Sequence, residues 1–274
     1  MTTRARKQNL AKYRLPKANL PYQILLLTKR NLKAIVRTPE ALIPPIAISV
    51  FFLLIYESTL GGAASFVPGL SGNSYLGFIL PLSIVSSALA GAGLASQNLV
   101  RDIESGYFDK LLLTPVSRTA LLLGPILAGA LILGFQTGIV IGVGLLMGLQ
   151  PVTGLAGLLA VIGMAVLLGT GFAGFTVSAA LGSGNAAVTQ SAGFIFFPLT
   201  FLTASFVPLA LLDGWLKTAA RANPITYVLE GMRDILNVGW VSASFWQGIL
   251  ACLILAVAMY ALAVFALRFR TRRS

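Results

Sequence analysis

Side chains that commonly carry out catalysis or bind metals are scarce in this sequence. The chain has no histidine and a single cysteine, Cys252, so it lacks the commonest general base and any metal-thiolate cluster. No Gly-Lys dipeptide occurs, which excludes a phosphate-binding loop of the Walker A type. The chain is therefore not expected to hydrolyse ATP by that chemistry. A membrane-embedded enzyme would lack its usual acid, base and metal ligands.

One short charged segment has a spacing that suits protein binding. Phe108, Leu111 and Leu112 are separated by three and four positions, so a short helix would present them as one apolar patch. Polar residues border this patch: Glu104, Asp109 and Lys110. Pro115 is expected to end the helix. A helix with such a patch can dock into a groove of another protein, although an ordinary amphipathic turn at a membrane surface has the same pattern.

The elements that position this segment are predicted to lie in a membrane. Residues 119–212 carry no formal charge, and the whole chain is 57% hydrophobic and only 10% charged. The mean hydropathy is +0.86. A soluble surface needs more charge than this, so the sequence predicts an all-α membrane protein with a single transmembrane domain over 1–274.

Runs of about 20 apolar residues predict six transmembrane helices. They cover 41–60, 74–99, 119–149, 154–182, 187–211 and 244–267. Most Lys and Arg residues fall in 1–37, 101–118 and 268–273, so the positive-inside rule places both termini and the loop at 101–118 in the cytoplasm. These cations flank apolar segments and do not alternate with aromatic residues, so nucleic-acid binding is not expected.

The basic N-terminal segment, 1–40, is predicted to be a cytoplasmic tail followed by a helix. No apolar core of 7–15 residues follows its first cations, so a cleaved signal peptide is not expected. On a helical projection of 24–37 the cations gather on one side and most apolar residues on another. This pattern is typical of an interfacial helix on the inner leaflet, and a solvated basic tail is the alternative.

Small residues recur every fourth position in the third predicted span. They are Ala130, Gly134, Gly138 and Gly142, and such a ladder lets two helix backbones approach closely in lipid. No Asp, Glu, Lys or Arg lies at mid-membrane depth in any predicted span. This absence argues against a proton- or ion-coupled secondary transporter, which usually needs buried ionisable groups.

Two stretches carry a resemblance to a known family. The run from Glu104 to Arg118 resembles the coupling-helix signature of type-2 membrane subunits of ATP-binding cassette exporters, which include daunorubicin-type drug efflux and lipo-oligosaccharide export permeases. The segment 201–208, the Trp215-Leu216 pair, the run 223–227 and Arg233 are similar to the stretch those permeases carry between their fifth and sixth spans. One departure is visible: the usual proline before the Trp-Leu pair is absent, and residues 212–214 stand there.

The resemblance implies roles for two sets of residues. A coupling helix would insert into a separate ATPase subunit through Glu104, Gly106, Phe108, Asp109, Leu111, Leu112, Pro115 and Arg118. Residues 206–240 would form an outer re-entrant pair of short helices that includes Pro208, Trp215, Asn223, Pro224, Tyr227, Glu230 and Arg233. The spacing of Glu230 and Arg233 predicts an ion pair on one helix face.

The resemblance also implies how such a chain would work. The chain would bind no cofactor itself, because ATP and Mg²⁺ would sit on the partner ATPase. It would form a homodimer or pair with a homologous permease in the cytoplasmic membrane of a prokaryote. Its cargo would be a hydrophobic or amphipathic drug, lipid or glycolipid, exported by alternating access. A non-transporting membrane scaffold or assembly factor is the alternative, followed by a membrane-embedded enzyme.

Overall fold

The computed structural model describes residues 19–61, 75–91, 93–205 and 209–273, and within these ranges the chain forms helices and no strands. A helix satisfies its backbone hydrogen bonds internally, which an apolar environment requires. The predicted basic tail before residue 19 and the predicted site residue Pro208 lie outside the described residues.

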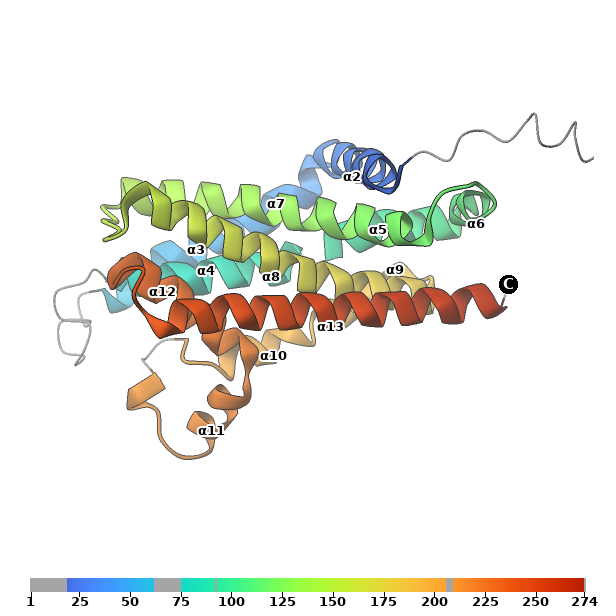
Figure 1. Ribbon diagram of the computed structural model, residues 1–274. Coiled ribbons are helices and arrows are strands. Elements are labelled where there is room, and N and C mark those ends of the chain that lie inside the picture. The colour runs from blue at the N-terminus through green and yellow to red at the C-terminus, as the bar shows by residue number, and fades with distance from the viewer. Residues whose placement is uncertain (1–18, 62–74, 92, 206–208, 274) are drawn as a thin grey trace, which may run out of the picture.

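Four of the described helices are long and apolar enough to cross a membrane. They are α3 (Pro39–Leu60), α7 (Arg118–Leu146), α8 (Gly154–Ser183) and α13 (Ala243–Arg273). These helices match the first, third, fourth and sixth predicted spans to within a few residues, except that α13 continues past the predicted end. In Figure 1, α7, α8 and α13 run side by side along the length of the molecule.

In the second predicted span, 74–99, the structure describes α4 (Tyr75–Gly91) and α5 (Gly93–Glu104), on either side of residue 92, which lies outside the described residues. The fifth predicted span consists of two shorter helices. In place of 187–211 the structure has α9 (Ala186–Gly193) and α10 (Phe196–Phe201). Pro198 lacks the N–H that would bond to the carbonyl of Phe194, so a continuous helix is interrupted there.

Small residues bring the long helices together, but only some of the predicted ladder does so. A methyl group added at Gly134 would lie 2.7 Å from Cγ2 of Val166 on α8, and one added at Gly169 would lie 3.1 Å from Cα of Ala130. At Gly138 and Gly142 no described atom lies within 4 Å of such a methyl group. Within this chain, close packing of α7 on α8 therefore depends on the first half of the ladder.

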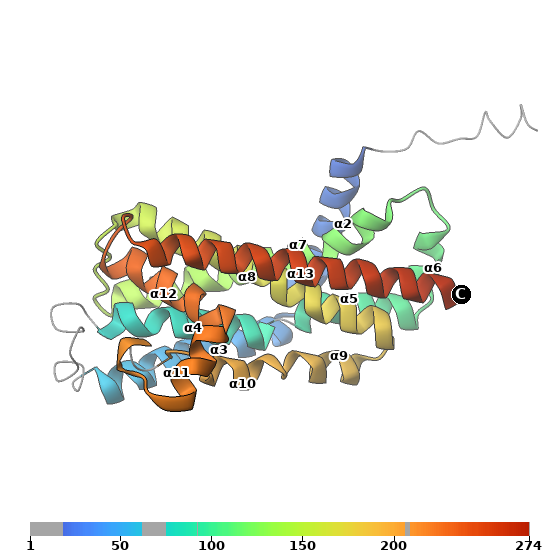
Figure 2. The ribbon, with the colours of Figure 1, turned by 60° about the horizontal axis from the view of Figure 1, so that its bottom comes forward.

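The predicted N-terminal helix is present as α2 (Leu20–Val36). It lies across α7 and projects from the bundle of long helices (Figures 1 and 2). A methyl group at Gly124 of α7 would approach Cβ of Leu27 to 2.6 Å, and Thr28, Asn31 and Ile35 of α2 are buried. One side of α2 therefore packs on protein, in addition to any contact with lipid.

The remaining short helices lie at the two ends of the bundle. At one end, α6 (Tyr107–Leu112) follows α5 and lies near the C-terminus (Figure 1). Towards the other end, α11 (Gly214–Ala222) and α12 (Pro224–Asn237) follow the 3-10 turn η2 (Leu209–Leu211). The predicted pair of short helices before the last span is therefore present, and α12 packs closely on α13 because Gly231 and Gly248 face each other.

Candidate functional site

The predicted coupling segment forms a tight helical hairpin between α5 and α7. Gly106 has a φ of 69°, a left-handed conformation that glycine adopts without steric cost, and it turns the chain from α5 into α6. Helix α6 ends at Leu112, so Pro115 lies beyond its end in the turn before α7. Ser117 caps α7, its Oγ accepting a hydrogen bond from the Ala120 N–H at 3.0 Å.

Phe108 occupies a different place from the one the sequence predicts. It was expected to share an exposed patch with Leu111 and Leu112, but its side chain is only 1% exposed. It belongs to a buried cluster drawn from α5, α7, α8 and α13 that includes Leu99, Leu122, Ile126, Val177, Leu181 and Leu267. Phe108 thus anchors α6 to its own bundle, because the apolar groove that receives it is formed by this chain.

Other residues form the exposed surface of the coupling segment. Leu113 is 88% exposed and Tyr107 is 42% exposed, while Leu111 and Leu112 are half-buried. Charged or polar members of the predicted set are also exposed: Glu104, Asp109, Lys110 and Arg118. The surface available to a partner therefore combines an apolar tip at Leu113 with charges of both signs around it.

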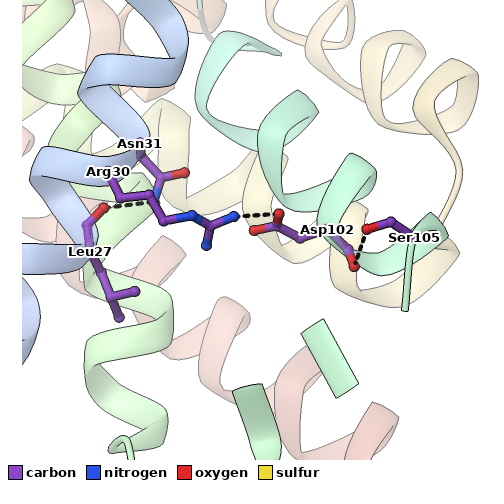
Figure 3. Close-up of polar contacts among 5 residues, drawn as sticks. All are labelled: Leu27, Arg30, Asn31, Asp102 and Ser105. Atoms are coloured by element: carbon purple, nitrogen blue, oxygen red, sulfur yellow. Dashed lines mark hydrogen bonds and ion pairs between the residues drawn. The ribbon is translucent and has the colours of Figure 1, made fainter. Parts of the chain in front are cut away.

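Helix α2 holds the coupling segment from one side. Arg30 donates a hydrogen bond to Oδ1 of Asp102 on α5 and forms an ion pair with it (Figure 3). The same guanidinium lies 4.6 Å from the ring centroid of Tyr107 on α6, within cation–π range. Gln23 accepts a hydrogen bond from the Ser117 N–H at 2.7 Å. Asn31 donates to the Leu27 carbonyl within α2 (Figure 3).

The last helix holds the segment from the other side. Arg270 near the end of α13 donates to the carbonyl of Leu181 at the end of α8, at 3.2 Å. Its guanidinium lies 6.0 Å from the ring centroid of Phe108. These contacts of Arg30, Gln23 and Arg270 were not predicted, because each joins residues that lie far apart in the sequence.

In the outer segment, the contacts of Arg233 differ most from those predicted. It was expected to pair with Glu230, but no such ion pair forms among the described residues. Arg233 is 5% exposed, and its guanidinium donates to the carbonyls of Phe78 at 2.8 Å, Ser205 at 2.7 Å and Ala204. It also lies 3.6 Å from the ring centroid of Phe78.

Backbone carbonyls surround the buried guanidinium in place of a carboxylate. Arginine stays protonated in folded proteins, so the Arg233 side chain carries its charge inside the protein. The carbonyls around Arg233 belong to backbone that needs donors, so donor and acceptors satisfy one another without a carboxylate.

Most of the other residues predicted for the outer segment shape and connect its short helices. Asn223 caps α12, its Oδ1 accepting from the Ile225 N–H at 3.0 Å, and Pro224 occupies the first helical position. The Tyr227 hydroxyl donates to the carbonyl of Arg221 at 2.8 Å, which ties α12 to α11. Trp215 is 75% exposed and therefore faces the surroundings of the protein.

A cavity that sequence reasoning did not identify lies between α3, α4, α5, α9 and α10. Its volume is about 210 Å³. The lining is mostly apolar, with residues such as Ile48, Phe52, Leu82, Leu94, Phe194 and Phe201, and none of the described lining residues carries a formal charge. Polar side chains on the lining are Ser86, Gln97, Gln190, Thr200 and Ser205. Such a surface suits an amphipathic molecule with a few hydrogen-bonding groups.

Comparison with known proteins agrees with this architecture. Residues 22–237 match the ABC-2 type transporter family, and the chain belongs to this family. It is therefore a multi-pass membrane permease subunit of an ATP-binding cassette transporter, a class that carries no ATPase domain and works with an ATPase subunit.

Individual relatives resemble the chain over most of its length. The probable doxorubicin resistance ABC transporter permease protein DrrC of Mycobacterium tuberculosis is 28% identical over 244 residues, covering 87% of each chain. A putative transport permease, ycf38, of Cyanophora paradoxa is 26% identical over 81% of this chain and 77% of its own. The ycf38 permease of Porphyra purpurea is 25% identical over 80% and 75%.

Proposed function

We propose that this chain is the membrane subunit of an ATP-driven exporter of hydrophobic or amphipathic compounds. The observation that carries the proposal is the uncharged, mostly apolar cavity between α3, α4, α5, α9 and α10. The similarity to a permease named for doxorubicin resistance supports an amphipathic drug as one class of cargo. A lipid or glycolipid has the same combination of apolar body and polar groups.

Six crossings with both termini in the cytoplasm fit the arrangement of helices. If α4 with α5 forms one crossing of the membrane, and α9 with α10 forms another, then successive crossings alternate in direction. The basic C-terminal end of α13 then lies on the same side as α6 (Figure 1), and Arg30 of α2 contacts Asp102 and Tyr107 there, in accord with the positive-inside rule. The pair α11 and α12 then lies towards the outer side as the re-entrant segment.

Two of the helices that line the cavity, α3 and α9, are largely uncovered by the rest of the chain. Most residues of α9 are exposed, and only 17% of the apolar stretch of α3 is buried within the chain. A second permease, identical or homologous, would cover these helices and enclose the transport pathway between two such cavities. Gln97 on α5 donates to Gln190 on α9 at 3.2 Å, and both side chains line the cavity.

Transport assays test the proposal directly. Cells that contain the permease and its ATPase should accumulate less of several amphipathic dyes and fluorescent lipids than cells with a hydrolysis-deficient ATPase. Ser86→Trp would fill the cavity and should lower export, whereas Leu159→Trp, at a 60% exposed site on α8, should not. A purely hydrophilic polymer as sole substrate would contradict the cargo class, and ATPase binding without stimulated transport would favour a scaffold.

A further inference from the structure

The irregular backbone at the end of α10 is held by side chains of α12. The Asn223 amide donates to the carbonyls of Leu199 at 2.6 Å and Leu202 at 3.1 Å. Arg233 donates to the carbonyls of Ala204 and Ser205. These carbonyls lie where the helix ends, and in an apolar environment each needs a donor. Two side chains of α12 supply four of those donors.

The segment that these donors hold is also a wall of the cavity. Thr200, Phe201 and Ser205 line the cavity, and the Ser205 and Thr203 hydroxyls both donate to the Thr200 carbonyl at 2.6 Å. Residues 199–205 are thus internally bonded and then bonded to α12. This part of the wall cannot move away from α12 without losing the hydrogen bonds of Asn223 and Arg233.

Arg233 connects this wall to the facing one. Its Nε donates to the Phe78 carbonyl at 2.8 Å and its guanidinium stacks on the Phe78 ring. Phe78 lies on α4 one turn before Leu82 and two turns before Ser86, and both of these line the cavity. A single guanidinium therefore bonds to both walls, α4 and residues 199–205, at the outer end of the cavity. Separating the walls would leave a buried charge without partners, which is strongly unfavourable.

We infer that Arg233, supported by Asn223, is a latch that holds α4 and residues 199–205 together at the outer end of the cavity in this conformation. Release of the latch lets α4 and residues 199–205 separate and opens the cavity to the outside. The inference rests on the proposed function in one respect, because it takes the cavity to be the transport pathway. It assigns Arg233 a positioning role that differs from the ion pair with Glu230.

A cysteine inside the cavity reports the state of the latch without any transport. Ser86→Cys places a thiol on the α4 wall, in a Cys252→Ala background that removes the natural thiol. A membrane-impermeant maleimide is added outside intact cells that contain the permease and its ATPase. Labelling should be slow with Arg233 present, and ATP-driven closure of the ATPase in the intact complex should accelerate it.

Substitutions of Arg233 or Asn223 should open the cavity even without ATP-driven closure of the ATPase. Arg233→Ala should raise the labelling rate about tenfold or more, since several charged hydrogen bonds are lost. Arg233→Lys should give a smaller rise, because an ammonium cannot reproduce the fork of donors. Asn223→Asp keeps the acceptor that caps α12 but loses the amide donors, and it should also raise labelling. The matched control Arg221→Ala, an exposed arginine on α11, should leave the rate unchanged.

The outcomes separate the latch from the proposed function. Slow labelling in both Arg233→Ala and Asn223→Asp overturns the latch, whatever the complex transports. If Arg233→Ala does not accumulate in the membrane, slow labelling in Asn223→Asp alone overturns the latch. Rapid labelling in Arg221→Ala as well would mean general loosening and would also overturn it. A complex that shows the expected labelling but exports no amphipathic compound contradicts the proposed function and leaves the latch standing.

Discussion

Replacing Phe108 by alanine tests whether α6 is held by its own bundle. The side chain is 1% exposed and packs against residues from four helices, and truncating such a phenylalanine costs about 3–5 kcal/mol. Helix α6 has only 6 residues, far fewer than the roughly 12–15 that an isolated helix needs for marginal stability. Without its anchor the segment should therefore move independently of α5 and α7.

The expected phenotype is loss of coupling with retained binding. In the purified complex, Phe108→Ala should still copurify with the ATPase, because Leu113 and the surrounding charges remain exposed. ATP hydrolysis should lose its dependence on cargo, and export should fall by at least about tenfold. Phe108→Leu loses less packing, so its export should lie between that of the wild type and that of Phe108→Ala. Leu113→Asp should do the opposite, weakening copurification without destabilising the permease, because Leu113 is 88% exposed.

Two results would refute this reasoning. Wild-type export by a Phe108→Ala complex would show that anchoring of α6 is unnecessary. Loss of the ATPase from Phe108→Ala together with normal binding by Leu113→Asp would show that Phe108 itself docks, as the spacing of apolar residues first predicts. Thermal stability of each purified permease, measured in the same detergent, controls for general unfolding.

Three further predictions concern contacts elsewhere in the chain. Gly134→Val should lower permease stability by about 1–3 kcal/mol in thermal unfolding because it overpacks the α7–α8 contact, whereas Gly138→Ala, with open space at its Cβ, should not. Arg30→Ala should cost about 1 kcal/mol or less of stability, since its ion pair is partly exposed, but should lower cargo-stimulated ATP hydrolysis in the reconstituted complex. Arg233→Ala should lower export in a transport assay, and a chain in which Glu230 and Arg233 are exchanged should export no better, because a carboxylate at 233 cannot donate to backbone carbonyls. Recovery of export in the exchanged chain would support the ion pair instead.

The pattern of apolar residues predicts that α6 is amphipathic but not what covers it. Phe108, Leu111 and Leu112 have the spacing of one helical face, and that spacing is the same whether the face meets a partner or the parent chain. The deciding factor is the groove formed by Val177, Leu267 and their neighbours, which come from distant parts of the sequence. Long apolar helices were predictable because their length and composition are local properties.

Arg233 shows a similar limit in the outer segment. Side-chain spacing identifies Glu230 as a partner, yet the guanidinium binds carbonyls of residues 78, 204 and 205. A sequence pattern records side chains, whereas free carbonyls arise only where a helix ends or bends. The break within the fifth predicted span, at Phe194, was overlooked because its flanking residues remain apolar.

The buried cluster around Phe108 can be completed only late in the synthesis of this protein. Phe108 lies about 160 residues before Leu267 in the chain, yet Leu267 and Ala263 of α13 form part of its buried cluster. During synthesis α6 is made well before α13 exists, so its anchor is incomplete until the last helix has been inserted. A chain truncated before α13 would present α6 without this support, so α6 is held firmly only in a permease whose last helix has been synthesised and inserted.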